Sequence, residues 1–252
     1  MTRTALITGA TAGFGREAAR LFVKDGWQVI GTGRRQDRLD ALAEELGASF
    51  RPVTLDMRDL AAVEAFGRAQ EGVDLLVNNA GLASPMTPLQ DAEWGPLEQV
   101  IETNISGLVA LTRALLPALI ARKGAVINIS SVAANYPYRG GAVYGGSKAF
   151  VREFSLCLRA DLHGTGVRVT SIEPGMAETE FTLVRNGWDQ AASDALYGGV
   201  EPMTGADIAA TIHWVATLPP HLNINSLELM PVNQDFAGFA VARPGSSQTP
   251  TA

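Results

Sequence analysis

Two residues in the second half of the chain have the types and spacing that a proton-transfer site requires. Tyr144 and Lys148 stand four residues apart in YGGSKAFVREFSLCLRADL, whose apolar residues recur at helical spacing, so both side chains project from one helix face. A free phenol has a pKa near 10 and is a poor base at neutral pH. We expect the Lys148 ammonium to favour the phenolate, and lowering the pKa of Tyr144 by about three units takes roughly 4 kcal/mol.

Two further polar residues complete this set. Ser131 lies thirteen residues before Tyr144, at the end of an expected strand, and can hydrogen-bond the oxygen of a substrate. Asn104, in TNISG, is expected to hold a water molecule that links Lys148 to solvent as a proton path. Each residue alone has a structural alternative, such as a half-buried tyrosine, a solvated lysine or a capping serine. Their combination favours catalysis.

A glycine-rich turn near the N-terminus indicates a nucleotide site. TGATAGFG places Gly9, Gly13 and Gly15 after an expected strand and at the start of an expected helix. A phosphate approaches a helix N-terminus closely only where the backbone turns tightly and no Cβ intervenes, so glycine is needed there. A structural loop in an unrelated α/β domain is the alternative. The alternating strands and helices that follow favour a dinucleotide.

Two arginines indicate which dinucleotide is bound. GTGRR places Arg34 and Arg35 where NAD-binding folds carry a carboxylate for the ribose. Guanidinium groups bind a 2′-phosphate through charge-assisted hydrogen bonds, whereas a carboxylate repels it. The sequence therefore predicts NADP, with a solvated charge pair at a helix start as the alternative. Asp37 follows the arginines and is expected to face solvent.

Residues after the third and fourth expected strands fit the adenosine half of the cofactor. Asp56 ends the third strand and could accept a hydrogen bond from the adenine amino group. NNAG follows the fourth strand, where Asn79, Ala80 and Gly81 are expected to line the ribose. Asn78 could instead tie neighbouring strands together, so we expect Asn79 rather than Asn78 to contact the cofactor.

The elements that position these residues alternate between strand and helix. Apolar residues at three- and four-residue spacing lie between short β-branched runs. Runs such as LLVN and AVINIS are apolar on both faces, which predicts a parallel sheet between two helical layers. The fold class is therefore α/β: a single-domain Rossmann-type doubly wound parallel sheet with its ligand crevice at the carboxyl ends of the strands. The seven expected strands are Thr4–Thr8, Gln28–Thr32, Phe50–Leu55, Val73–Asn78, Ala125–Ser130, Val167–Ile172 and Ser226–Met230.

One domain over residues 1–240 and a disordered tail over 241–252 are expected from composition. Thr179–Val200 is longer than a usual crossover and contains Gly187 and Trp188. We expect a mobile lid there, with an ordinary surface insertion as the alternative.

Charge and cysteine usage limit the classes of partner. The 252 residues include 20 basic and 26 acidic side chains, a formal net charge of −6 without a basic cluster, which argues against nucleic acid. Cys157 is the single cysteine, so no disulfide forms within the chain, and no cluster predicts a metal. His163, His213 and His221 are expected on helix ends and turns, in structural or solvated roles.

No membrane or export signal is evident. The most apolar stretch, Gly107–Ala121, carries Arg113 and is shorter than the roughly 20 residues of a membrane span. The N-terminal residues lack a signal-peptide pattern. We expect a cytoplasmic protein with small-molecule partners.

The motifs in this order resemble those of the short-chain dehydrogenase/reductase family over essentially the whole chain. They are TGATAGFG, NNAG, Asn104, Ser131, Tyr144-x-x-x-Lys148 and the Pro174-Gly175 turn followed by Thr179. The resemblance implies hydride transfer at the nicotinamide, with Tyr144 as general acid/base, Lys148 as its pKa partner and ribose ligand, Ser131 as substrate orienter and Asn104 as water holder. It also implies a homotetramer. The expected cofactor residues are Gly9, Thr11, Gly13, Phe14, Gly15, Arg34, Arg35, Asp56, Met57, Asn79, Ala80, Gly81, Tyr144, Lys148, Pro174, Gly175 and Thr179.

Further stretches resemble a narrower group, the NADP-dependent serine 3-dehydrogenases and 3-hydroxy acid (L-allo-threonine) dehydrogenases. Together with TGATAGFG, they are GTGRRQDRL, YGGSKAFVREFSL, DLHGTGVRVTSIEPGMAETEF and INSLELMPVNQDFAGF. This resemblance implies oxidation of a hydroxyl β to a carboxylate, so the substrate set becomes Ser131, Tyr144 and a cation. Arg185 in the lid matches the group and is preferred over Arg139 as that cation.

Two alternatives stay open from the sequence. The first is an NADPH-dependent reductase of another small aldehyde or ketone, such as a sulfoaldehyde, because a sulfonate can replace a carboxylate beside Arg185. The second, more remote alternative is a nucleotide-sensing protein without catalysis. Near the pocket, the chain departs from the narrower group at Arg139, at Ala142 and at Ser84-Pro85-Met86.

Overall fold

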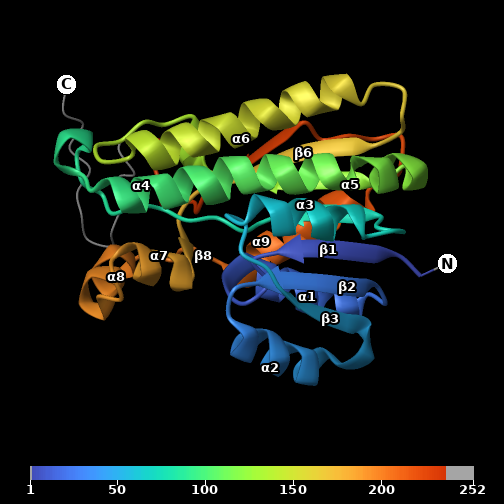
Figure 1. The fold of residues 1–252 in the computed structure, drawn as a ribbon. Coiled ribbons are helices and arrows are strands. Elements are labelled where there is room, and N and C mark those ends of the chain that lie inside the picture. Colours follow the sequence, from blue (N-terminus) through green and yellow to red (C-terminus); the bar gives the residue numbers. More distant parts are fainter. Residues whose placement is uncertain (1, 237–252) are drawn as a thin grey trace.

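A seven-stranded parallel sheet forms the centre of the computed structural model, which describes residues 2–236 (Figure 1). The strand order is β3-β2-β1-β4-β5-β6-β9, so the chain reverses direction across the sheet between β1 and β4 and opens a crevice there. The predicted α/β fold is confirmed, and each predicted strand ends within two residues of the observed one. The strands are β1 (Thr4–Thr8), β2 (Gln28–Gly33), β3 (Phe50–Thr54), β4 (Leu75–Asn78), β5 (Ala125–Ile129), β6 (Arg168–Pro174) and β9 (Ser226–Leu229).

Helices cover both faces of this sheet. One layer consists of α1 (Gly13–Lys24), α2 (Gln36–Leu46) and α9 (Gly205–Thr217), and it buries Phe22 and Ile212 against the strands. The other layer consists of α3 (Leu60–Arg68), α5 (Leu108–Arg122) and α6 (Ala142–Asp161), and it buries Leu111 and Leu115. Because both faces are covered, β4 and β5 are buried throughout and β1 is buried from Ala5 onward, which explains their largely apolar sequence.

The helix before β5 is longer than its apolar stretch predicted. α4 (Trp94–Ile101) runs through a π-helical turn at Glu102–Gly107 into α5. By length and composition this 29-residue run is apolar enough to cross a membrane. Leu111, Leu115 and Leu119 nevertheless have no exposed surface, because they pack on the sheet. The run is therefore a core helix of the second layer.

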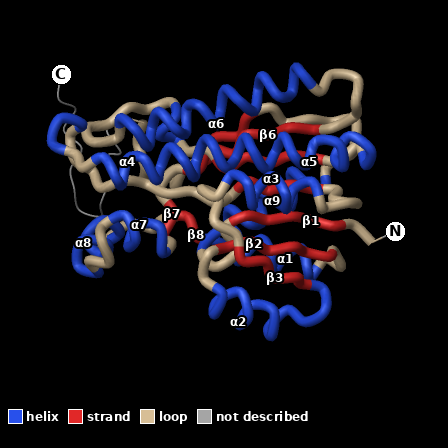
Figure 2. The backbone as a smooth tube through the Cα atoms, in the orientation of Figure 1, coloured by secondary structure: helices blue, strands red, loops and turns tan. Residues whose placement is uncertain are grey.

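The segment Thr179–Val200, which we call the lid, projects beyond the carboxyl ends of the strands (Figure 2). β7 (Ala177–Glu178) pairs in parallel with β8 (Met203–Thr204), so the two ends of the lid are held side by side. The lid contains α7 (Glu180–Arg185) and α8 (Gln190–Tyr197). Gly187 and Trp188, which separate these helices, both have a positive φ. The tail expected at 241–252 lies outside the described residues.

Candidate active site

The glycine-rich turn between β1 and α1 has a backbone that side chains would block. Gly9 and Gly13 have φ angles of +70° and +52°, which disfavour residues with a Cβ. A Cβ on Gly15 would lie 2.4 Å from the carbonyl oxygen of Gly9. The three glycines therefore keep the backbone bare at the start of α1.

Asn79 supports this turn with its side chain. Its Nδ2 donates to the carbonyl oxygens of Thr8 at 2.8 Å and of Gly9 at 3.2 Å. The Thr8 hydroxyl in turn accepts the backbone N–H groups of Asn79 and Ala80. Asn78 instead donates to Asn128 at 2.8 Å and so ties β4 to β5. The Asn79 side chain thus holds the turn. The backbone of Ala80 and Gly81, which follows it, is therefore the part of NNAG expected to face a ribose.

The residues present fit a bound dinucleotide phosphate. Ala12 precedes α1 in an extended conformation and gives no side-chain cap, so the first N–H groups of the helix are left for an anion. Thr179 closes the other side, since a Cβ on Gly13 would lie 3.5 Å from it. The Met57 side chain is buried in the core, and the partly buried Phe14 side chain packs against the other core cluster, so we expect these residues to meet the cofactor through their backbone.

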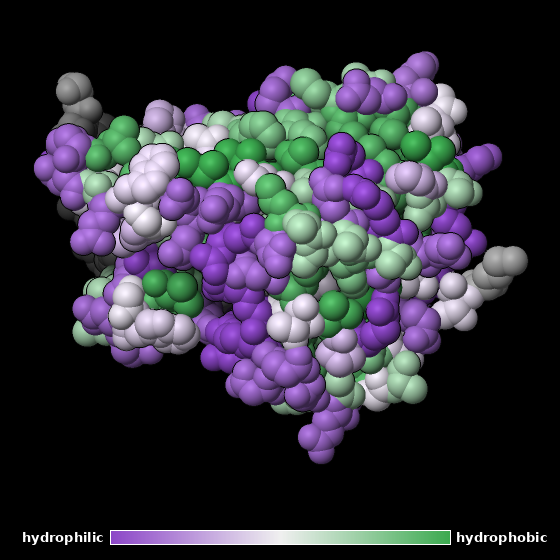
Figure 3. All heavy atoms as spheres, in the orientation of Figure 1, coloured by the Kyte–Doolittle hydropathy of each residue, from purple (hydrophilic) through white to green (hydrophobic). Residues whose placement is uncertain are grey.

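The two predicted phosphate arginines differ in their surroundings. Arg34 is exposed, whereas Arg35 donates to the Thr11 hydroxyl at 3.0 Å and forms an ion pair with Glu180 of the lid. Arg38 forms a second ion pair with Glu180. Sequence reasoning missed Arg38, although it lies one helical turn after Arg35 on α2. Figure 3 shows hydrophilic side chains gathered between the lid and α2.

Asp56 is already engaged by an arginine. Arg58 donates to the Asp56 carboxylate at 2.6 Å, and this hydrogen bond lowers the pKa of Asp56. The carboxylate is thus charged, and its side chain keeps 31% of its surface exposed. Asp37 is exposed, as expected.

Tyr144 and Lys148 lie one turn apart at the start of α6, and both are buried. The Lys148 Nζ donates to the carbonyl oxygen of Ile129 at 2.8 Å and lies 5.8 Å from the centre of the Tyr144 ring. Gly81 approaches closely, since a Cβ there would lie 3.4 Å from the Lys148 Nζ. The helix therefore brings the phenol and the amine to one side of the crevice, beside the backbone of NNAG.

In the folded chain alone, the pKa of Tyr144 shifts in the direction opposite to the one expected from Lys148. Burial raises the pKa of Tyr144 to about 12, although a hydrogen bond with Ser131 and the charge of Arg185 act in the opposite direction. Burial also lowers the pKa of Lys148 to about 8. The physical reason is that both groups lose water, and the ammonium is hydrogen-bonded to Ile129 rather than to the phenol.

Ser131 is fixed next to the phenol. It follows β5, and its Oγ accepts the N–H of Ala133 at 3.1 Å while lying 3.4 Å from the Pro174 carbonyl oxygen. The same hydroxyl hydrogen-bonds the Tyr144 side chain. A substrate oxygen placed between these two hydroxyls would contact both.

Asn104 is held in the π-helical turn with 1% of its surface exposed. Its Nδ2 donates to the Leu82 carbonyl oxygen and to the Ser147 hydroxyl, each at 2.9 Å. Its Oδ1 accepts the N–H of Leu82 at 2.8 Å. These three hydrogen bonds join the NNAG loop to α6. One lone pair of Oδ1 remains for a water molecule.

The lid brings Arg185 to Tyr144. The Arg185 guanidinium lies 5.5 Å from the centre of the Tyr144 ring and donates to the Tyr138 hydroxyl at 2.8 Å. Phe181, also in the lid, lies 5.8 Å from the Tyr144 ring. Arg139 is exposed in the loop before α6. Of the two candidate cations, Arg185 is the one placed beside the phenol.

Two supporting contacts were not predicted. The Gln234 Oε1 accepts the backbone N–H of Met176 at 2.6 Å and so holds the turn after Pro174. Asn135 donates to both Glu173 and Glu228, at 2.8 and 2.7 Å, and so braces the short helical turn after Ser131. Both contacts join segments far apart in sequence, and no local pattern marks them.

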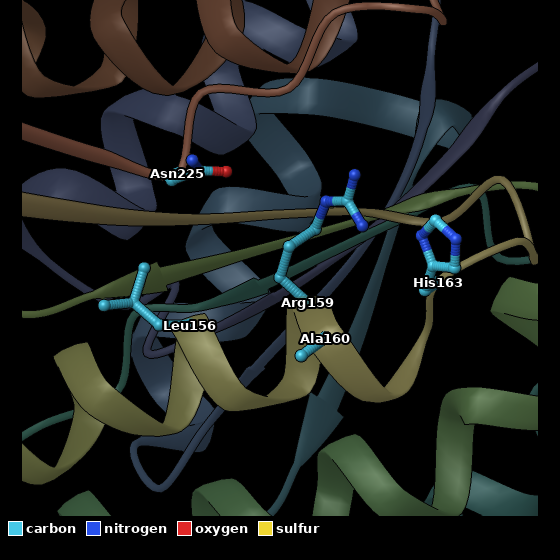
Figure 4. Close-up of a pocket in the computed structure, with 5 residues that line it drawn as sticks. All are labelled: Leu156, Arg159, Ala160, His163 and Asn225. Atoms are coloured by element: carbon cyan, nitrogen blue, oxygen red, sulfur yellow. The ribbon is translucent and has the colours of Figure 1, made fainter.

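One cavity lies away from this site. A cavity of about 540 Å³ opens at the C-terminal end of α6, lined by Leu156, Arg159, Ala160, His163 and Asn225 (Figure 4). Tyr144 lies near the opposite end of this 20-residue helix, roughly 18–24 Å along the helix axis from Leu156 and Ala160.

The histidines are structural or exposed. His213 lies within α9 rather than at a helix end, and its ring bonds Asp25 at 2.9 Å. Within residues 2–236, no group of three or more histidine, cysteine or acidic side chains could hold a metal ion.

Comparisons with known proteins cover nearly the whole chain. A family model described as short chain dehydrogenase matches residues 3–190. The chain is 62% identical over 252 residues to serine 3-dehydrogenase from Rhizobium radiobacter, covering 96% of this chain and 99% of that protein. It is 53% identical to sulfoacetaldehyde reductase 2 from Chromohalobacter salexigens, covering 96% and 100%. A solved structure, the closed form of serine dehydrogenase complexed with NADP+, matches with a TM-score of 0.90 and 49% identity, covering 95% and 99%.

Proposed function

Since this chain belongs to the short-chain dehydrogenase family and is an oxidoreductase, we propose that it uses NADP to oxidise the C3 hydroxyl of serine-like 3-hydroxy acids, or to reduce the matching semialdehydes. The observation that carries the substrate class is the position of Arg185, 5.5 Å from the Tyr144 ring. A guanidinium there binds a carboxylate while the neighbouring hydroxyl meets the phenol. Membership of an enzyme family removes the support for a non-catalytic nucleotide sensor.

The residues divide the work of proton transfer and orientation. Tyr144 takes the proton of the substrate hydroxyl, and Ser131 hydrogen-bonds the same oxygen. When bound, NADP supplies the nicotinamide carbon that accepts the hydride. The positive charge of Lys148 favours the phenolate form of Tyr144, which is the form that can accept the proton of the substrate hydroxyl. Asn104 positions the NNAG loop against α6, through its bonds to Leu82 and Ser147.

The cofactor residues follow from the fit of the glycine turn. The backbone from Gly9 to Gly15, with Thr179 opposite, would hold the pyrophosphate, and Arg34 and Arg35 would hold the 2′-phosphate. Asp56 and the backbone of Asn79, Ala80 and Gly81 would line the adenosine. Pro174 and Gly175 would lie beside the nicotinamide.

A Tyr144→Phe variant tests the mechanism. We expect turnover to fall by about 10²–10⁴-fold, which is the usual contribution of proton transfer by a positioned side chain. NADPH binding, followed by its fluorescence, should stay within about twofold of that of the unmodified protein. A variant with turnover near that of the unmodified enzyme would remove Tyr144 from the mechanism.

A second candidate substrate is a small sulfoaldehyde. It is favoured by the 53% identity to a sulfoacetaldehyde reductase, and a sulfonate is an anion that Arg185 can also bind. The kcat/KM values for serine, 3-hydroxypropionate and sulfoacetaldehyde, read by NADPH absorbance, separate the two. A higher value for sulfoacetaldehyde would replace the hydroxy-acid assignment.

We further propose that the protein assembles as a homotetramer and acts in the cytoplasm.

A further inference from the structure

Glu180 connects the base of the lid to the predicted 2′-phosphate site. It lies in the first turn of α7, directly after Thr179, and its two carboxylate oxygens bond one arginine each. Arg35 comes from the end of β2, 145 residues away, and Arg38 comes from α2, 142 residues away. One acidic side chain of the lid therefore holds two of the three arginines in this part of the sequence.

Glu180 places a negative charge within the predicted 2′-phosphate site. Its side chain is 22% exposed, and those of Arg35 and Arg38 are 35% and 38% exposed, so solvent screens these ion pairs only in part. Arg35 also donates to Thr11, in the glycine turn, so its guanidinium lies against the cofactor side of the site. A phosphate that binds Arg35 thus meets a guanidinium already neutralised by a carboxylate.

We propose that Glu180 is a specificity-determining residue, which competes with the cofactor 2′-phosphate for Arg35 and Arg38. This inference rests on the proposed use of NADP. Two anions that share the same cations weaken each other's binding, and the effect is reciprocal. Glu180 therefore limits the affinity for a 2′-phosphorylated ligand, and that ligand in turn loosens the hold of the arginines on the start of α7.

The test uses two adenosine ligands that lack the nicotinamide. Adenosine 2′,5′-bisphosphate carries the 2′-phosphate, and adenosine 5′-monophosphate does not. In a Glu180→Gln variant we expect the bisphosphate to bind about three- to tenfold more tightly by calorimetry, with little change for the monophosphate. The gain should shrink at high salt, because the charges are partly exposed.

A matched control separates this local effect from net charge. Glu201→Gln removes the same charge at an exposed position between the lid and β8, and should leave both affinities unchanged. A second readout is amide hydrogen exchange of the peptide that covers α7. In the unmodified protein, the bisphosphate should speed this exchange and the monophosphate should not, and Glu180→Gln should exchange quickly with either.

The outcomes distinguish this inference from the function on which it rests. If the unmodified protein binds both ligands equally, the NADP assignment fails and the inference falls with it. If the bisphosphate is preferred but binds Glu180→Gln equally or more weakly, NADP use stands and competition by Glu180 is overturned. Weaker binding would mean that Glu180 positions the arginines for the phosphate.

Discussion

Burial shifts the pKa values of the two side chains at the centre of the site in opposite directions. Tyr144 and Lys148 have 8% and 6% of their surface exposed, and loss of water disfavours the charged form of each. The phenol is therefore held neutral, with its pKa near 12, and the amine loses its proton more easily, with its pKa near 8. In the folded chain alone the phenol therefore keeps its proton, and the positive charge of a bound nicotinamide would add to that of Lys148 in favouring the phenolate.

The lowered pKa of Lys148 predicts a pH-dependent stability. The folded-state pKa, about 8, lies below the unfolded value of 10.5, so the penalty for the buried charge is complete below pH 8 and is relieved as pH rises toward 10.5. Relative to Lys148→Met, the free energy of unfolding of the unmodified protein without cofactor should rise by about 2 kcal/mol from pH 7 to pH 9.5. Urea denaturation at the two pH values measures this difference. Parallel curves for the two proteins would show that the ammonium is solvated.

The position of Arg185 predicts a defect confined to the substrate. In Arg185→Met, kcat/KM for a 3-hydroxy acid should fall roughly 30- to 100-fold, because a charge-assisted hydrogen bond contributes about 2–3 kcal/mol. The dissociation constant of NADPH should not change. Arg139→Met is the matched control, since Arg139 is exposed and lies in the loop before α6. A larger loss in the control would move the substrate cation to Arg139.

At the scale of elements, the π-helical turn at Glu102–Gly107 is what brings Asn104 into the site. Its last residue, Gly107, packs directly on the backbone after β3, and a Cβ there would lie 2.2 Å from the carbonyl oxygen of Met57. The helix can therefore approach the third strand only because this residue has no side chain. This close approach also positions Asn104 to accept the hydrogen bond from the backbone N–H of Leu82.

Two glycines of the same helical run test this argument. Gly107→Ala should lower the free energy of unfolding by about 2–4 kcal/mol and reduce turnover, because backbone atoms must shift to admit the methyl group. Gly95→Ala, at an exposed position of α4 with open space around it, should be neutral or stabilise by up to about 1 kcal/mol. Chemical denaturation of both variants measures the contrast. Equal changes in the free energy of unfolding for the two variants would mean that helix propensity alone determines the effect.

The elements that could be predicted from sequence are those with local causes. Buried parallel strands such as β4 and β5 are apolar along their whole length, and a glycine-rich turn announces itself by residue type. The pair of β7 and β8 has two residues in each strand, so neither leaves a periodic pattern. The π-helical turn at Glu102–Gly107 resembles an ordinary helix in sequence, and its close approach to Met57 joins segments far apart in the chain.

The same distinction holds for the site. Tyr144 and Lys148 are four residues apart, so a helix alone brings them together, and their positions followed from spacing. The raised pKa of Tyr144 depends on burial by the lid and the sheet, which no local pattern records. The pairing of Glu180 with Arg35 and Arg38 spans more than 140 residues and needed the folded chain.

At the scale of the whole molecule, apolar surface remains on the outer side of the second helical layer. Figure 3 shows hydrophobic residues spread over α5 and α6. Ile120 on α5 is 40% exposed and Phe150 on α6 is 37% exposed, and the Phe150 ring stacks on Phe154. Large aromatic side chains that are rigid and partly exposed are typical anchors of protein interfaces. This surface is the one through which the proposed homotetramer would assemble.

The proposed assembly predicts a change of mass on a single substitution. The unmodified protein should sediment as a tetramer, and Phe150→Glu should sediment as smaller species, because each copy would bury a charge at the interface without a partner. Leu89→Glu is the control: Leu89 is 57% exposed but lies in the segment before α4, on neither α5 nor α6. Sedimentation velocity at several concentrations measures both. A monomeric unmodified protein would contradict the assembly, and a tetrameric Phe150→Glu would place the interface on another face.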